Sequence, residues 1–398
     1  MIFLPIEKSL FCYSYLFIPN GIRGKPRCLL TMKGIFMSRT KRLRTIVIVL
    51  TMILNTGLSA ENLGRILGIL EPTGIEISDN ELYILQGATI HVFSLPRLHP
   101  VRAMGVRGEG PGELKVTPWL SNAMILFPDH IILGSIDKYI SFAKSGRILE
   151  EQRRNPAFTQ VIPFEGIQAV RKRIVEEGAQ YSTINIFNPE TQSLKELYRQ
   201  RFSAGRGEVD AVPDSIHFTV FGGLIYIDQS AEGFVVAAYD KSGALVSKIN
   251  PPVKNIRLKD TDRILALEAM KEDPFINMNT GGWENYQKTT RINFPSYFPP
   301  IRDFVLSEGR IIVQTYLIQG DEEEYIFLDL EGNIKQRLFL PVSEKPCFTE
   351  EMMGTGVRYF AFSPDHYYRL IIREEWCELD RISLTDSFKV AENRQAEH

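Results

Sequence analysis

Cysteine is scarce in this chain, which restricts the redox chemistry that it can perform. The 398 residues include four Cys, and two of these, Cys12 and Cys28, lie ahead of residue 37. No Cys-x-x-Cys-His sequence is present to attach haem, which argues against a haem protein. Cys347 and Cys377 leave two interpretations open. They form a disulfide across a loop of about 30 residues, as pairs in oxidising compartments often do, or they are separately buried thiols.

Histidine and the common nucleophile motifs are also sparse. The six His show no pair at the spacing of zinc ligands. His130 and His366 each follow a Pro-Asp dipeptide, which favours a turn, so we expect no zinc site from them. A Gly-x-Ser-x-Gly elbow is absent, and so is the Gly-Lys-Ser/Thr end of a phosphate loop. The sequence therefore contains no motif that names a hydrolase or a nucleotide-binding protein.

Long apolar runs are missing, apart from one short stretch at residues 46–54. A basic segment, 38–44, precedes this run, and Ala60 places a small residue where a signal peptidase cuts. A membrane-spanning helix needs about 20 apolar residues. The run therefore fits a signal peptide over 37–60 better than the alternative, an uncleaved membrane anchor. We expect export to the periplasm or the extracellular space, with no stable membrane span after cleavage.

Met37 is the expected start of translation, because a signal peptide acts at the N-terminus of a chain. Residues 1–36 would then be an upstream extension. Residues 1–60 hold nine Lys/Arg and one Asp/Glu, which leaves 37 basic and 47 acidic residues, a net charge of −10. Such an acidic domain excludes nucleic acid as a partner, because phosphates require a basic surface.

The chain does contain a recurring pattern, in which a β-rich run reaches a short polar turn and a second β-rich run follows. Five such turns begin near Ser94, Ala143, Asn188, Asp240 and Asp329. The first steps are 49, 45 and 52 residues, and the last, of 89 residues, equals about one repeat plus an insertion. A period of roughly 40–50 residues filled with short strands is typical of propeller blades. We predict an all-β fold, a six-bladed β-propeller of four-stranded blades.

A helical insertion is predicted between the fourth and fifth blades, over residues 251–300. Residues 263–271 favour a helix, and a long aromatic, Asn- and Pro-rich loop follows. The insertion is either a decoration of one blade or a lid over one face. The propeller is predicted over 61–386, with a disordered tail at 387–398. Residues 65–70 have no blade of their own. We expect them to add a strand to the last blade, because an open ring leaves unpaired edges.

A glycine-rich string, 108–113, lies between the first and second blades. Its spacing is not that of a dinucleotide fingerprint, and no helix is predicted after it. Pro111-Gly112 suits a type II turn, in which Pro fixes φ and Gly adopts positive φ. Weaker echoes at 205–208 and 354–356 also fall at blade junctions. This repetition favours a structural role over ligand binding, although such loops also surround the channel mouth.

Residues 107–114, Arg-Gly-Glu-Gly-Pro-Gly-Glu-Leu, followed by blade-length repeats and a late hydrophobe-Asp-x-x-Gly hairpin, resemble the exported six-bladed β-propeller family of bacteria. That family is related to NHL-repeat propellers, and the resemblance covers residues 62–386. Leu114 stands where the family usually has Phe. The resemblance implies a fold and an export route rather than an activity. Six-bladed relatives include calcium-dependent lactonases and esterases and a zinc lyase, which need metal ligands that converge at the channel.

Candidate binding residues come from the innermost strands and from the glycine-rich string. Arg and aromatic side chains are common binding anchors, although they also occur in β cores. The candidates are Arg107, Glu113, Trp119, Arg302, Arg358 and Tyr359. We predict a binding module without catalytic activity or cofactor, which engages a protein, glycan or small-molecule ligand at the channel mouth. The alternative is a calcium-dependent lactonase or esterase with its site at the central channel.

Overall fold

The structure is a computed structural model. It describes residues 60–117, 122–202, 204–205, 207–343, 347–353 and 357–384. The chain divides into two units, 1–56 and 57–398, and every described residue belongs to the second. The predicted upstream extension, residues 37–59 of the predicted signal peptide and the C-terminal tail lie outside the described residues.

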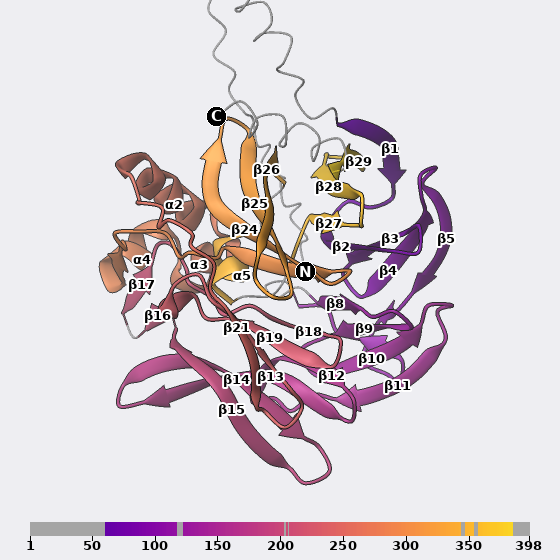
Figure 1. The fold of residues 1–398 in the computed structure, drawn as a ribbon, viewed down its shortest axis with the longest axis horizontal. Coiled ribbons are helices and arrows are strands. Elements are labelled where there is room, and N and C mark those ends of the chain that lie inside the picture. The colour runs from indigo at the N-terminus through magenta and orange to yellow at the C-terminus, as the bar shows by residue number, and fades with distance from the viewer. Residues whose placement is uncertain are drawn as a thin grey trace, which may run out of the picture. The chain divides into compact units, whose positions relative to one another are not determined.

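Six four-stranded antiparallel sheets form a ring of blades, as the sequence predicts (Figure 1). Blade 1 contains β2 (Pro72–Ser78), β3 (Glu81–Gln86), β4 (Thr89–Ser94) and β5 (His99–Met104). Blade 2 contains β8 (Ala123–Leu126), β9 (His130–Gly134), β10 (Lys138–Ala143) and β11 (Ile148–Arg153). Blade 3 contains β12 (Phe158–Phe164), β13 (Ile167–Glu176), β14 (Ala179–Asn188) and β15 (Ser193–Arg201).

The second half of the ring follows the same order, with the first strand of each blade innermost. Blade 4 contains β18 (Phe218–Phe221), β19 (Leu224–Asp228), β20 (Val236–Tyr239) and β21 (Leu245–Ile249). Blade 5 contains β23 (Asp303–Ser307), β24 (Arg310–Gln319), β25 (Glu322–Asp329) and β26 (Ile334–Pro341). Blade 6 contains β27 (Phe360–Phe362), β28 (His366–Ile372), β29 (Trp376–Ser383) and β1 (Glu61–Leu67).

The ring is closed by β1, the outermost strand of blade 6. It pairs antiparallel with β29, with Glu61 opposite Arg381 and Leu67 opposite Trp376. The predicted closing strand is therefore confirmed. This closure also explains why the sequence shows five outer turns for six blades. In blade 6 the two outer strands are joined only by hydrogen bonds, so no turn links them.

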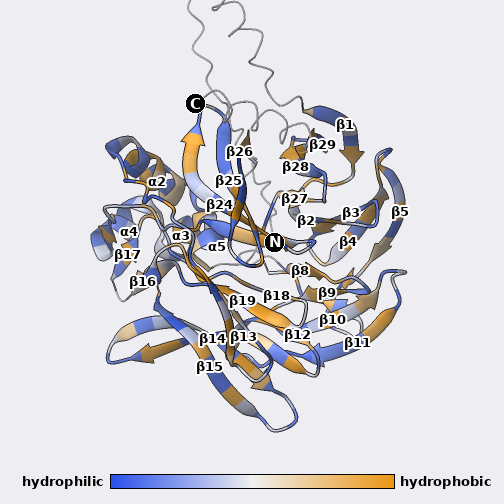
Figure 2. Cartoon of the chain, viewed as in Figure 1, coloured by the Kyte–Doolittle hydropathy of each residue, from blue (hydrophilic) through white to orange (hydrophobic). Residues whose placement is uncertain are grey.

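The core lies between the blades, because each blade packs its faces against its neighbours. Central strands are covered on both faces, so β3 buries all four residues from Leu82 to Leu85. Outer strands meet solvent, and five of the six residues of β11 are exposed. Figure 2 shows the resulting interleaving of hydrophobic and hydrophilic residues along the strands.

The insertion between blades 4 and 5 is helical, as predicted, but it contains three helices rather than one helix and a long loop. These are α2 (Asp260–Glu272), α3 (Pro274–Thr280) and α4 (Trp283–Thr289). Pro274 occupies the first position of α3, where its missing N–H costs nothing. Asp273 caps this helix by accepting a hydrogen bond from the Ile276 N–H at 2.9 Å.

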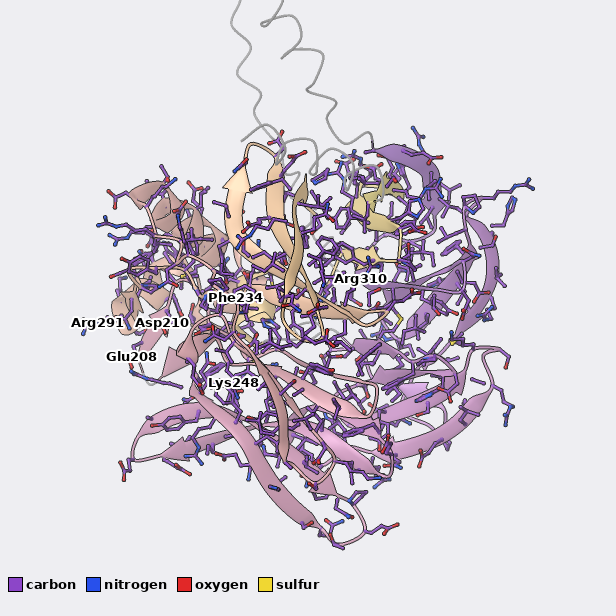
Figure 3. All side chains as sticks on the ribbon, viewed as in Figure 1. Glu208, Asp210, Phe234, Lys248, Arg291 and Arg310 are labelled. Atoms are coloured by element: carbon purple, nitrogen blue, oxygen red, sulfur yellow. The ribbon has the colours of Figure 1, made fainter. Side chains whose placement is uncertain are left out.

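A small mixed sheet ties the insertion to the junction between blades 3 and 4. It consists of β16 (Ala204–Gly205), β17 (Glu208–Asp210) and β22 (Arg291–Asn293), and β22 runs parallel to β17. Figure 3 shows Glu208 and Asp210 close to Arg291 at this edge. Met270 and Ile276 of the insertion are buried with Phe348 of α5 (Phe348–Met353), a helix that precedes blade 6.

Candidate functional site

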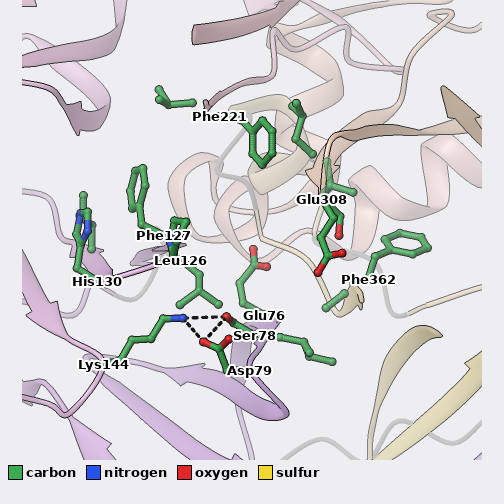
Figure 4. A pocket seen from close by; sticks show the side chains of 18 of the residues that line it. Glu76, Ser78, Asp79, Leu126, Phe127, His130, Lys144, Phe221, Glu308 and Phe362 are labelled. Carbon is green, nitrogen blue, oxygen red and sulfur yellow. Dashed lines mark hydrogen bonds and ion pairs between the residues drawn. The ribbon is translucent and has the colours of Figure 1, made fainter. Parts of the chain in front are cut away.

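A cavity of about 1410 Å³ lies at one end of the ring (Figure 4). It is lined by the turns that join the first and second strand of each blade, which we call the inner turns. One lining residue from each inner turn, in blade order, is Asn80, Pro128, Glu165, Gly222, Glu308 and Pro364. Because every blade contributes, the cavity is one mouth of the central channel, which we call the turn end.

Four of the inner turns use left-handed backbone. Blade 4 uses the pair Gly222-Gly223, with φ of 57° and 75°. Asp79, Glu165 and Glu308 adopt φ of 52°, 45° and 48° in the corresponding turns of blades 1, 3 and 5. Two-residue turns of this hand match the twist of the flanking strands, but they favour Gly, Asn and Asp over Glu. Backbone geometry therefore does not explain the two glutamates.

The residue before each inner turn divides the mouth into two halves. Blades 2, 3 and 4 place a phenylalanine there, and blades 5, 6 and 1 place a serine. In that order the residues are Phe127, Phe164, Phe221, Ser307, Ser363 and Ser78. All of them line the cavity, and Figure 4 shows Phe127, Phe221 and Ser78 around it. Each set belongs to consecutive blades, so the mouth has a continuous phenylalanine half and a continuous serine half.

The basic side chains of the lining are already ion-paired. Lys144 pairs with Asp79 and donates to the Ser78 hydroxyl at 2.9 Å, as Figure 4 shows. Arg381 pairs with Glu61, and the third basic residue, Arg358, pairs with a carboxylate beneath the cavity. Each of these positive charges of the cavity wall is therefore balanced by a neighbouring carboxylate.

Two of the exposed carboxylates of the lining have neither an ion pair nor a hydrogen bond among the described residues. Glu308 and Asp365 form no hydrogen bond or ion pair through their carboxylates within the part of the chain that the structure describes. Both residues are solvent-exposed at the mouth. Their charges are therefore free to meet a ligand.

Deeper in the cavity, Glu76 of β2 projects toward its centre (Figure 4). Burial raises the pKa of Glu76 to about 7, against an opposing effect of the Arg358 guanidinium. Arg358 donates a forked pair of hydrogen bonds to Asp303, one at 2.8 Å, and a third to the Phe304 carbonyl at 2.9 Å. Burial opposes the ionisation of Asp303, but Arg358 outweighs it and lowers the pKa of that carboxyl.

The opposite end of the channel, where the inner strands begin, is covered by α5; we call it the helix end. Ser215, which precedes β18, donates to the carbonyls of Glu351 and Met352 at 2.8 and 2.7 Å. Arg171 of blade 3 donates to the Met353 carbonyl at 2.6 Å. Arg302, which precedes β23, lies 3.2 Å from the Glu351 carboxylate. Three blades therefore hold α5 in place (Figure 1).

The insertion supports the same helix. Asp273 is buried and accepts hydrogen bonds from the Thr349 N–H at 2.7 Å and from its hydroxyl at 2.9 Å. None of the insertion helices lines the cavity at the turn end. Of the two roles left open by the sequence, the contacts match a decoration that braces the helix end.

A buried His-Asp pair in blade 4 joins the residue before β18 to the last residue of β19. His217 Nδ1 is 2.8 Å from Asp228 Oδ2, and Asp228 is fully buried. Burial lowers the pKa of His217, but the hydrogen bond and charge of Asp228 outweigh it and raise that pKa. Among the described residues, no group of three or more His, Cys, Asp or Glu is arranged to hold a metal ion.

The candidate residues from the sequence are spread over three places. Arg358 lines the cavity at the turn end, and Arg302 lies at the helix end between Glu351 and Glu323. Tyr359 packs against the core between blades 6 and 1. The structure thus brings one of these residues to the cavity.

The other candidates lie elsewhere. Arg107 is exposed on β6 (Val106–Arg107), which pairs with β7 (Glu113–Leu114) at the junction of blades 1 and 2. The Glu113 carboxylate accepts a hydrogen bond from the Gly110 N–H at 2.8 Å, which supports a structural role for the glycine-rich string. Neither residue lines the cavity. Trp119 lies outside the described residues.

The two cysteines do not form a disulfide in the structure. Cys347 precedes α5, where burial raises the pKa of its thiol to about 12. Cys377 is buried in β29, and its thiol donates to the Ile69 carbonyl at 3.3 Å. They belong to different parts of the fold and are separate thiols in the structure.

The sequence reasoning missed the phenylalanine and serine halves and Glu308. It aligned the repeats on their outer turns, which lie far from the channel. An alignment on the inner turns, such as Phe164-Glu165-Gly166 with Phe221-Gly222-Gly223, contains the signal.

Comparison with known proteins finds solved structures whose similarity to this chain concerns the fold alone. No protein-family model and no curated protein matches the chain. A solved structure of a DUF4221 family member from Bacteroides vulgatus aligns with 10% identity and a TM-score of 0.39, covering 81% of this chain and 98% of that one. A luciferin-regenerating enzyme aligns with 10% identity and a TM-score of 0.40, covering 82% and 95%. BamB from Moraxella catarrhalis aligns with 8% identity and a TM-score of 0.27, covering 77% of this chain and 71% of that one.

Proposed function

We propose that this protein is a binding module without catalytic activity, and that its ligand occupies the cavity at the turn end. The single observation that carries the proposal is the cavity itself. It is formed by all six blades, it has one aromatic and one hydroxyl-bearing half, and it presents the unpaired carboxylates of Glu308 and Asp365. Concave sites with an apolar wall and a few placed polar groups are typical of ligand binding. The helix end, covered by α5, is not proposed as a binding site.

We further propose that the protein is exported and belongs to the exported six-bladed propeller family that its glycine-rich string resembles. Support comes from the basic and apolar segments ahead of Ala60. Because β1 begins at Glu61, cleavage after Ala60 leaves the closing strand complete. In the described residues, no helix is long and apolar enough to cross a membrane. N-terminal sequencing of the native product tests the export proposal, and a peptide from residues 1–36 would contradict it.

Filling the cavity tests the binding role. Ser307→Trp places a large ring inside the mouth, whereas Ser193→Trp places it on the exposed outer strand β15. A melting-temperature screen of amines, sugars and short peptides is run on the wild type and both variants. We expect ligands that stabilise the wild type and Ser193→Trp but not Ser307→Trp. Ligands that stabilise all three proteins equally would place binding elsewhere and overturn the proposal.

The competing hypothesis is a calcium-dependent hydrolase, favoured by the carboxylates of Glu76 and Asp303 near the channel. Elemental analysis of the purified protein and its melting temperature before and after chelation separate the two. One calcium per chain, with a lower melting temperature after chelation, would replace the binding module with the hydrolase and direct a screen of lactones and esters.

A further inference from the structure

The charges and rings of the cavity indicate what kind of ligand it takes. Resting on the binding role proposed above, we propose that the cavity binds an organic cation: an ammonium or guanidinium group carried on an apolar stem. The group belongs to a free amine or to a lysine or arginine side chain, which share this chemistry.

The lining carries more negative than positive charge. Its carboxylates are Glu76, Asp79, Glu150, Glu165, Glu308 and Asp365. Its three basic side chains, Lys144, Arg358 and Arg381, are each paired with a carboxylate. A cleft with low-dielectric walls focuses the field of such charges and raises the local concentration of the opposite ion. The cavity therefore attracts cations and repels anions.

The phenylalanine half supplies the surface for the stem. Ring faces carry partial negative charge and attract a cation within about 6 Å, while they also pack against methylene groups. Phe127 stacks on His130 with ring centroids 4.6 Å apart, which fixes the orientation of that ring. Phe362 adds a further ring from blade 6 (Figure 4). These surfaces offer nothing to a phosphate or carboxylate.

The serine half and its acidic turns supply the site for the charged head. Glu308 and Asp365 belong to neighbouring blades, 5 and 6, and Ser307 and Ser363 precede them in the two turns. An ammonium group has three N–H donors and no acceptor, so carboxylate and hydroxyl oxygens satisfy it fully. A neutral sugar would use the hydroxyls but gain little from the unpaired charges.

Calorimetry with matched six-carbon probes tests the inference. Hexylammonium, hexanol and hexanoate share a stem and differ in charge. We expect hexylammonium to bind at least about tenfold more tightly than hexanol, because a charged hydrogen bond outweighs a neutral one. Hexanoate should not bind. The double variant Glu308→Gln/Asp365→Asn should lose that preference, whereas Glu331→Gln, an exposed change in the outer turn of blade 5, should keep it.

A second variant separates the two halves. Phe221→Leu keeps an apolar side chain but removes the ring, so both hexylammonium and hexanol should bind several-fold more weakly. Equal binding of hexanol and hexylammonium, or an unchanged preference in the double variant, would overturn the cation inference while leaving the binding role intact. No binding of any probe, with no ligand blocked by Ser307→Trp, would overturn both. Nα-acetyl-lysine amide as a further probe distinguishes a peptide side chain from a free amine, according to which of the two binds more tightly.

Discussion

The two ends of the channel are built on the same six inner strands, yet they treat their charges differently. At the helix end, Arg302 lies 3.5 Å from Glu323 and 3.2 Å from Glu351. At the turn end, Glu308 and Asp365 are exposed and unpaired among the described residues. Removing one member of a buried pair is costly, whereas an exposed carboxylate contributes little to stability. One end of the channel therefore uses its charges to hold the ring together, whereas the other carries carboxylates that contribute little to its stability.

The largest effect is expected for Arg302→Met at the helix end. The substitution leaves Glu323, which is 1% exposed, without its cation. We expect the free energy of unfolding to fall by about 3–4 kcal/mol. Urea denaturation measures it, with Lys254→Met, an exposed residue in the insertion, as the control. A loss no larger than that of Lys254→Met would remove the distinction between the two ends.

Asp273→Ala should cause the second-largest loss of stability, because this carboxylate joins the insertion to α5. The substitution removes the cap of α3 and both hydrogen bonds from Thr349, so we expect the free energy of unfolding to fall by about 2–3 kcal/mol. Asp260→Ala, an exposed change at the start of α2, is the matched control. Ligand affinity at the turn end should stay unchanged in Asp273→Ala. A parallel loss of binding would show that the two ends are coupled.

The raised pKa of Glu76 predicts that the stability of the protein depends on pH. Its pKa is about 7 in the folded protein against 4.5 ordinarily, so its ionisation opposes folding. Stability should fall as the pH rises from about 4.5 to about 7, and Glu76→Gln should remove this fall. At pH 8 the variant should exceed the wild type by on the order of 2 kcal/mol, and at pH 4 the two should be equal. Arg358 and Asp303 are the charged groups nearest to it. Identical pH profiles in urea denaturation would refute the prediction.

The smallest effect is expected at the junction of blades 1 and 2. Glu113→Ala removes the hydrogen bond to the Gly110 N–H, worth about 1 kcal/mol. Ligand binding should not change, because Glu113 does not line the cavity. Glu109→Ala, an exposed change in the same string, serves as the control for thermal unfolding. Weaker ligand binding in Glu113→Ala would extend the recognition surface beyond the turn end.

Local patterns account for the parts of the fold that could be predicted. Each blade is a run of short β-rich segments between polar turns, so strand positions follow from a few neighbouring residues. In blade 1, for example, the β-rich segments 74–77, 81–85, 89–93 and 101–104 each fall within one of the four observed strands. The helix of the insertion was predicted in the same way, from consecutive helix-forming residues in α2.

Short elements that depend on distant contacts were not predicted. α5 has six residues, too few to form a stable helix alone. Ser215, Arg171 and Asp273 hold it from three separate parts of the chain. Arg358 was a candidate because of its residue type, but its partner Asp303 is 55 residues away and no local pattern links them.

The sequence by itself determined the number of blades, the closing strand and the residue that stands before each inner turn. Only the tertiary structure decided that the phenylalanines of blades 2–4 form one half of a cavity and the serines of blades 5, 6 and 1 the other. The physical reason is the ring closure. Strand and turn preferences act over a few residues, whereas the mouth exists only once β1 pairs with β29, which joins Asn62 to Asp380 across 318 residues.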